Sequence, residues 1–233
     1  MTDSGAAKRI LIINPNSNTR VTEEIDRSVD AERRAAELDI VCVDLPEAPQ
    51  GIESDEDIAA VEPLVERKIH DESTAYDAFV IACYSDPGLR ASRAATDKLV
   101  FGIQESAADL AASYGKRFGV LALSRDSIQR HIAYIRSIGL HEFHAGERPL
   151  GISVAESVAD PQTLDKIVAT GRELIEADGA ELLVLGCAGM VRHRAAAQER
   201  LGVPVIDPVL AAVKMAKQSL GQLQESHQSG ESP

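Results

Sequence analysis

Residues 77–83 read DAFVIAC and residues 181–187 read ELLVLGC, so one pattern occurs twice in the chain, 187 − 83 = 104 positions apart. In each copy an acidic residue is followed by five small or apolar residues and then a cysteine. A short, wholly apolar run bounded by polar residues is typical of a parallel strand that is covered on both faces. The repeat therefore predicts two equivalent strands, each ending at a cysteine.

Two further matches keep the same order along the chain. The pair KR at 8–9 precedes an apolar run, as does the pair KR at 116–117, a shift of 116 − 8 = 108 positions. The segment VFGIQ at 100–104 resembles VPVID at 203–207, a shift of 203 − 100 = 103 positions. Any two strand and helix units look somewhat alike, but three matches in one order favour an internal duplication.

The pattern around these matches alternates apolar runs with amphipathic stretches. Strands are predicted at 10–13, 38–43, 78–82, 100–103, 118–123, 182–185 and 203–206. Helices are predicted at 21–36, 57–74, 88–97, 106–113, 127–138, 161–177, 194–200 and 209–220. This alternation indicates an α/β fold with mostly parallel sheets flanked by helices, in which ligands bind at the carboxyl ends of the strands. The duplication divides it into halves of about 8–115 and 116–223.

Composition narrows the class of protein. With 233 residues, 44% of them hydrophobic, the chain is long enough for one large domain or two small ones. The net charge of −13 argues against nucleic acid and anionic membranes as partners. No apolar run approaches the roughly 18 residues of a membrane span, and the apolar run at 10–13 is shorter than we expect for a secretory leader. We therefore expect a cytoplasmic protein.

Three cysteines, an odd number, are spread widely along the chain, so we expect free thiols. Their spacing, and that of the six histidines, gives little support to a metal site. A single cysteine is most often a small buried hydrophobe, and we interpret Cys42, inside a predicted strand, in that way. The same role for Cys83 and Cys187 does not explain why both stand at the ligand-facing end of equivalent strands.

Two such thiols suit racemisation of a carbon acid. The reaction removes a proton from one face of a carbon and returns a proton to the other, so an acid and a base must flank that carbon. Cysteine performs either task, because backbone N–H groups at a helix N-terminus lower the thiol pKa. The same amides could stabilise an enolate oxygen. Cys83 and Cys187 are therefore the predicted catalytic residues, and no cofactor or metal is expected.

Several polar or small residues near the strand ends are candidates for binding a small-molecule substrate. Asn14 directly follows the first predicted strand, and its amide both donates and accepts, as a ureide ring requires. Ser124 holds the equivalent position in the second half, although helix capping would explain either residue. The remaining candidates flank the two cysteines: Tyr84, Ser85, Gly186, Ala188 and Gly189.

Three other residues near the site have plainer explanations. His193 follows Cys187 closely, but the RHR run at 192–194 is more typical of a solvated helix face. Asp86 and Glu105 could orient groups in a pocket, and helix capping or exposure explains them equally well. These three are not expected to carry the chemistry.

Taken together, INPNS at 13–17, ACYSDPGL at 82–89 and LGCAGM at 185–190 resemble the hydantoin racemases of the aspartate/glutamate racemase superfamily. GIES at 51–54 and GIQE at 102–105 extend the resemblance over nearly all of residues 8–220. The resemblance implies two pseudo-symmetric α/β domains with the active site in the cleft between them, and Cys83 and Cys187 match both family cysteines. In amino-acid racemases of the superfamily, polar side chains suited to a free amino acid follow the cysteines. Here the pairs Tyr84-Ser85 and Ala188-Gly189 take those places, which favours a neutral ring.

On this basis we expect a first domain at 8–115 plus 207–223 and a second at 116–206, with a frayed end at 1–7 and a disordered tail at 224–233. The expected activity is cofactor-independent racemisation of 5-substituted hydantoins by a homo-oligomer. Allantoin racemases share the motifs and are the nearest alternative. A decarboxylase of the arylmalonate type or a maleate isomerase, using one cysteine, and a ligand-binding sensor without catalysis are further alternatives.

Overall fold

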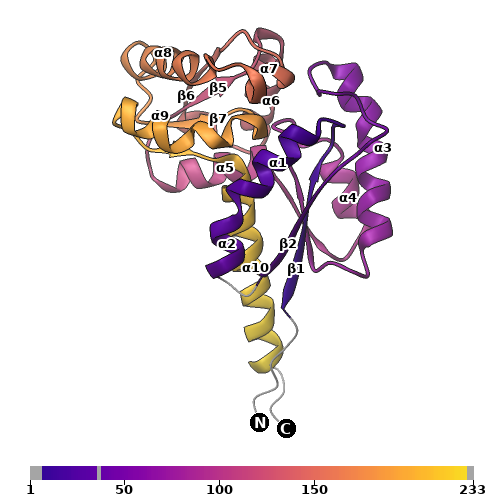
Figure 1. Cartoon of the computed structure of the whole chain (residues 1–233). Helices are drawn as coiled ribbons and strands as arrows, with labels where there is room; N and C mark the ends of the chain where they lie inside the picture. The colour runs from indigo at the N-terminus through magenta and orange to yellow at the C-terminus, as the bar shows by residue number, and fades with distance from the viewer. Residues whose placement is uncertain (1–6, 36–37, 230–233) are drawn as a thin grey trace.

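The computed structural model describes residues 7–35 and 38–229, and within them the strands form two parallel four-stranded sheets. The first sheet has the order β2-β1-β3-β4 and the second the order β6-β5-β7-β8. The first contains β1 (Lys8–Asn14), β2 (Leu38–Asp44), β3 (Ala78–Ile81) and β4 (Leu99–Gly102). The second contains β5 (Phe118–Ala122), β6 (His144–Pro149), β7 (Leu182–Leu185) and β8 (Val205–Ile206). The predicted α/β class with two related sheets is confirmed (Figure 1).

Helices connect the strands and cover both faces of each sheet. They are α1 (Thr19–Ser28), α2 (Asp30–Ala35), α3 (Asp55–Glu72), α4 (Leu89–Ala95), α5 (Ile103–Ser113), α6 (Arg125–Ser137), α7 (Val154–Ala159), α8 (Thr163–Glu176), α9 (Arg194–Leu201) and α10 (Pro208–Ser229), with short 3₁₀ helices η1 (His141–Phe143) and η2 (Ala188–His193). None of the helices in the described part of the chain is long and apolar enough to cross a membrane.

The two repeated runs that end in cysteine form β3 and β7, and every residue of both strands is buried. The acidic residue at the start of each run anchors the neighbouring strand: the Asp77 carboxylate accepts a hydrogen bond from Arg9 N at 2.9 Å, and Glu181 accepts one from Arg117 N at 3.2 Å. At the other end, Ala82 N donates to Ile13 O, as Gly186 N does to Leu121 O. The repeat is therefore present in the hydrogen bonds as well as in the sequence.

The third sequence match is displaced by two positions. Phe79 pairs with Val100 in the first sheet, and the equivalent Leu183 pairs with Val205 in the second, a shift of 205 − 100 = 105 rather than 103. On this register Gly102, and not Gln104, is the counterpart of Asp207. The sequence match aligns Ile103 with Ile206, but β8 is only two residues long and is preceded by Pro204, so it gives too short a pattern to fix the register.

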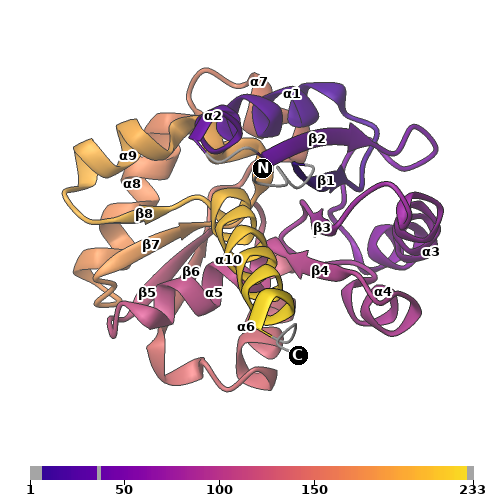
Figure 2. The same cartoon turned by 90° about the horizontal axis from the view of Figure 1, so that it is seen from below.

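The last helix of each half packs on the sheet of the other half. α5 follows β4, yet Ala107, Ala108 and Ala111 pack against β5 and β7. α10 follows β8, yet Val209, Ala212 and Val213 pack against β1 and β3. Figure 2 shows α10 lying between the two sheets. This exchange couples the halves through a shared core, so that the carboxyl ends of their strands are held in fixed relation.

The domain limits stay a prediction, although the strands divide between residues 8–115 and 116–206 as expected. α5 covers the second sheet while lying in the range predicted for the first domain. The tail predicted from residue 224 is helical as far as Ser229, as the end of α10. Residues 1–6 and 230–233 lie outside the described part.

Some elements differ from the prediction. The helix predicted at 21–36 is two helices, because the first ends at the cap Val29 and the second begins at Asp30. β6 and α7 were missed. β6 has the sequence HAGERP, whose polar residues, glycine and proline hide a strand that pairs only with β5.

Candidate active site

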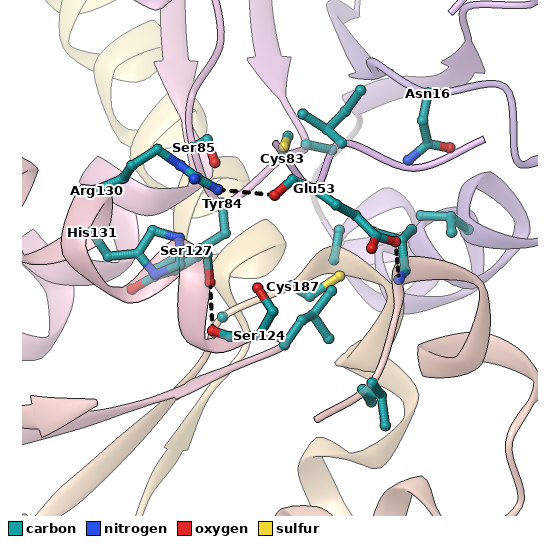
Figure 3. A pocket seen from close by; sticks show the side chains of 18 residues that line it. Asn16, Glu53, Cys83, Tyr84, Ser85, Ser124, Ser127, Arg130, His131 and Cys187 are labelled. Atoms are coloured by element: carbon teal, nitrogen blue, oxygen red, sulfur yellow. Dashed lines mark hydrogen bonds between the residues drawn. The ribbon is translucent and has the colours of Figure 1, made fainter. Parts of the chain in front are cut away.

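A cavity lies where the carboxyl ends of β3 and β7 face each other, and Cys83 and Cys187 both line it (Figure 3). Its walls come from both halves of the chain. The lining residues are Asn16, Val21, Ile52, Glu53, Ala82, Cys83, Tyr84, Ser85, Leu123, Ser124, Ser127, Arg130, His131, Ile152, Val154, Gly186, Cys187 and Ala188. A small molecule held here would therefore meet one thiol from each sheet.

Cys83 begins a tight turn between β3 and α4. Asp86 N donates to Cys83 O at 2.9 Å, and Asp86 itself takes a left-handed backbone conformation with φ 44°. The buried Asp86 carboxylate then accepts from Gln104 N and Glu105 N at 3.0 and 2.9 Å, which caps the start of α5. A side chain at Gly102 would overlap that carboxylate. Asp86 thus fixes the Cys83 turn to α5, and capping is its role.

Cys187 is held in a different way. It is the N-cap residue of η2, and its Sγ accepts a hydrogen bond from Gly189 N at 3.3 Å. Ser157 of α7 is fully buried against this turn, and a methyl group at Gly189 would overlap its Oγ. Because α7 lies this close, only glycine fits at position 189.

Burial raises the pKa of both thiols, that of Cys83 to about 12 and that of Cys187 to about 11. Hydrogen bonds from Ser85 to Cys83, and from Gly189 and Ser157 to Cys187, act in the opposite direction but are the smaller influence. The expected lowering of the thiol pKa is therefore outweighed by desolvation. Burial also raises the pKa of Cys42 to about 12, so position, and not acidity, distinguishes the two cavity cysteines.

The predicted binding residues are mostly at the cavity. Tyr84, Ser85, Ser124, Gly186 and Ala188 line it, whereas Asn14 and Gly189 are not among the lining residues.

Asn14 organises the neighbouring loop instead. Its amide nitrogen donates to Asn16 Oδ1 at 3.0 Å and to Thr22 Oγ1 at 3.1 Å. Asn16 Oδ1 also accepts from Asn18 N, which leaves the Asn16 amide nitrogen for a ligand. The loop singled out from the sequence therefore reaches the cavity through Asn16, two residues after the predicted Asn14.

Sequence reasoning missed most of the polar wall. Glu53, Ser127, Arg130 and His131 line the cavity. The Glu53 carboxylate accepts from Val154 N at 2.8 Å, and its backbone oxygen accepts from Arg130 Nη2 at 3.3 Å. Glu53 stands in the GIES motif, which was a usable signal. The three residues of α6 appeared in the sequence only as an amphipathic helix, and nothing there marked which face meets a cavity.

His193 does not take part in the cavity. Its Nε2 accepts from Arg192 Nε at 3.0 Å, and its pKa is lowered to about 4 by burial and by that neighbouring charge. Glu105 pairs with Arg93. In the described residues no group of three or more His, Cys, Asp or Glu side chains is arranged to hold a metal ion.

The chain is similar to known proteins over most of its length. The family model for Asp/Glu/hydantoin racemases matches residues 10–216. A hydantoin racemase of Pseudomonas sp. (strain NS671) is 35% identical over 90% of this chain and 84% of its own length.

Two solved structures have the same fold throughout. The allantoin racemase of Klebsiella pneumoniae superposes with a TM-score of 0.85 at 30% identity, covering 93% of this chain and 89% of its own. That of Pseudomonas fluorescens gives 0.86 at 27% identity, covering 93% and 92%. The chain belongs to the Asp/Glu/hydantoin racemase family.

Proposed function

We propose that this protein is a cofactor-independent racemase of cyclic ureides, with 5-substituted hydantoins as its substrates and Cys83 and Cys187 as its acid and base. Membership of the family makes the chain an isomerase of the racemase type. The observation that carries the proposal is the position of the two thiols, which line one cavity from equivalent turns of two related sheets.

The reaction moves one proton out and one proton in. The thiolate of one cysteine takes the proton from C5 of the ring, and the C–H electron pair passes into the adjacent carbonyl to give an enolate. The thiol of the other cysteine then gives its proton to the opposite face of C5, and the carbonyl forms again. One cysteine ends as a thiol and the other as a thiolate, so the reverse reaction begins from the product state.

The cavity walls suit a small ring with polar edges. The Asn16 amide and the hydroxyls of Ser85 and Ser124 offer hydrogen bonds to ring carbonyl and N–H groups. Val21, Ile152 and Val154 form an apolar part of the wall, where an aliphatic substituent at C5 would be buried.

Allantoin is the second candidate substrate, and one observation favours it. Ser127, Arg130 and His131 make one wall polar, and such a wall would hydrogen-bond a ureido substituent. The structural likeness to two allantoin racemases supports the same candidate.

The test follows the circular dichroism of each enantiomer of 5-substituted hydantoins and of allantoin, with purified protein in reducing buffer that contains a chelator. We expect the signal to decay to zero with no change in substrate mass. The rates rank the two substrate classes. Loss of CO₂ would point to a decarboxylase, and a covalent adduct on Cys83 to an isomerase that uses one cysteine. Binding without turnover that survives replacement of both cysteines would indicate a sensor.

A further inference from the structure

A buried cluster of ionisable side chains lies against the cavity and has no part in the two-cysteine exchange. It consists of His131 from α6 and His144 and Glu147 from β6. Their side chains are 3%, 9% and 0% exposed, respectively. Charged groups are seldom buried this completely unless they are paired or serve a function.

Within the cluster, one nitrogen of His131 is already engaged. Its Nδ1 lies 2.9 Å from Glu147 Oε2. The other carboxylate oxygen, Glu147 Oε1, lies 3.5 Å from His144 Nε2, and these two atoms make no hydrogen bond in the structure. The Glu147 carboxylate therefore engages Nδ1 of the His131 ring, and Nε2 is left as the ring nitrogen available to a ligand.

The other contacts of His131 direct it toward the catalytic turn. His131 lines the same cavity as both cysteines. Its ring meets the edge of the Tyr84 ring at 5.0 Å between centroids and 81° between planes, and Tyr84 directly follows Cys83. The imidazole is thus fixed by a carboxylate on one side and an aromatic ring on the other.

We propose that His131 is a further catalytic residue, whose Nε2–H donates a hydrogen bond to the enolate oxygen that forms during proton exchange. This role rests on the proposed racemase function. Because Nδ1 is engaged by Glu147, Nε2 is the remaining ring nitrogen, and in this role its N–H faces the substrate in the cavity that His131 lines. The proton stays on the imidazole, so the exchange between the cysteines is unchanged and only the charge on the enolate is stabilised.

A matched pair of substitutions separates this role from a structural one. Asparagine places its amide nitrogen near the position of Nδ1, so H131N keeps a donor to Glu147 and loses the donor to the substrate. Glutamine reaches the position of Nε2, so H131Q does the reverse. H70N is the control, because His70 also lies beside a carboxylate, that of Asp71, but its side chain is 76% exposed and does not line the cavity.

We expect H131N to lower kcat for racemisation about 100-fold with KM changed little, since loss of one oxyanion donor costs about 10²–10³ in kcat. H131Q should keep kcat within about tenfold of the wild-type value, and H70N should have the same kcat as the wild type. Full activity of H131N, or equal losses in H131N and H131Q, would overturn the role proposed for His131 and leave the proposed racemase function standing. A wild-type protein that racemises no hydantoin would overturn the proposed function, and this role with it.

A second measurement needs no variant to be active. 5,5-Dimethylhydantoin has no proton at C5, so it is a probe that binds without turnover. In protein labelled with ¹⁵N-histidine, its binding should shift the Nε2 resonance of His131, identified as the signal absent from H131Q. A probe that binds and leaves that resonance unmoved contradicts the proposal.

Discussion

The two halves of the molecule each place a cysteine at the equivalent point of their own sheet, but they hold it in place by different means. In the second half, Asp207 caps its own helix, α10, with bonds of 2.8 and 3.0 Å to Val209 N and Leu210 N. In the first half the equivalent position is Gly102, and the capping carboxylate comes from Asp86 in the Cys83 turn.

This difference separates the features that the two halves share from those in which they differ. The sheet order, the strand register next to the cysteine and the capped helix are the same in both halves. The residue that supplies the cap is free to change. In the first half the cap ties the Cys83 turn to α5, whereas the Cys187 turn is fixed by close packing on Ser157. The two cysteine turns should therefore respond differently to substitution.

The largest expected effect tests whether the halves contribute equally to the chemistry. C83S and C187S should each lower the racemisation rate at least about 100-fold, since a positioned acid or base contributes about 10²–10⁴. Each variant should still exchange the C5 proton of one enantiomer with deuterium, and the two variants should act on opposite enantiomers. Polarimetry and NMR in D₂O measure the two quantities.

C42S is the matched control for these variants, because Cys42 is also a free thiol of raised pKa but lies in β2. It should racemise like the wild type. Full racemase activity in C83S or C187S would contradict the two-base mechanism.

A smaller effect is expected from the close packing that is peculiar to the Cys187 turn. G189A should lower activity about 10-fold and destabilise the protein by about 1–3 kcal/mol, because the new methyl group overlaps Ser157 Oγ. Removing that oxygen in S157A/G189A should restore part of the loss. Thermal unfolding and racemisation rates of the single and double variants complete the cycle.

G202A separates the clash from the general effect of replacing a glycine. Gly202 has φ 72° and open space around it, so its substitution strains the backbone without touching a neighbour. We expect a loss of stability in G202A that S157A does not relieve. If S157A relieved both variants equally, the packing explanation at Gly189 would be wrong.

The sequence was sufficient for the features that depend on local pattern. Apolar runs predicted the buried strands, and their repetition singled out Cys83 and Cys187. It was insufficient where distant segments meet. Asp86 caps a helix that begins 17 residues further on, as 103 − 86 = 17 shows. His131 is held at the cavity in part by Glu147, which comes from β6, a polar strand without an apolar run. Such contacts depend on tertiary packing and leave no periodic signal.

The smallest expected effect compares the two capping carboxylates through pH. Burial raises the pKa of Asp86 to about 7 and that of Asp207 to about 6, both above the 3.8 of an unperturbed aspartate. At any pH between 3.8 and the raised pKa of each aspartate, the folded state holds a proton that the unfolded state has lost. The free energy of unfolding should therefore fall as pH rises from about 4 to each folded pKa.

Urea unfolding of the wild type, D86N and D207N across pH 4–8 measures these contributions, because asparagine keeps an acceptor oxygen and does not titrate. D86N should flatten the slope up to about pH 7, and D207N only up to about pH 6. An unchanged slope in D86N would mean that its carboxylate is charged throughout, held by the two N–H groups of α5. D86N should also lower the racemisation rate, since Asp86 fixes the Cys83 turn to α5. D207N should change stability alone, because Asp207 caps α10 and belongs to neither cysteine turn.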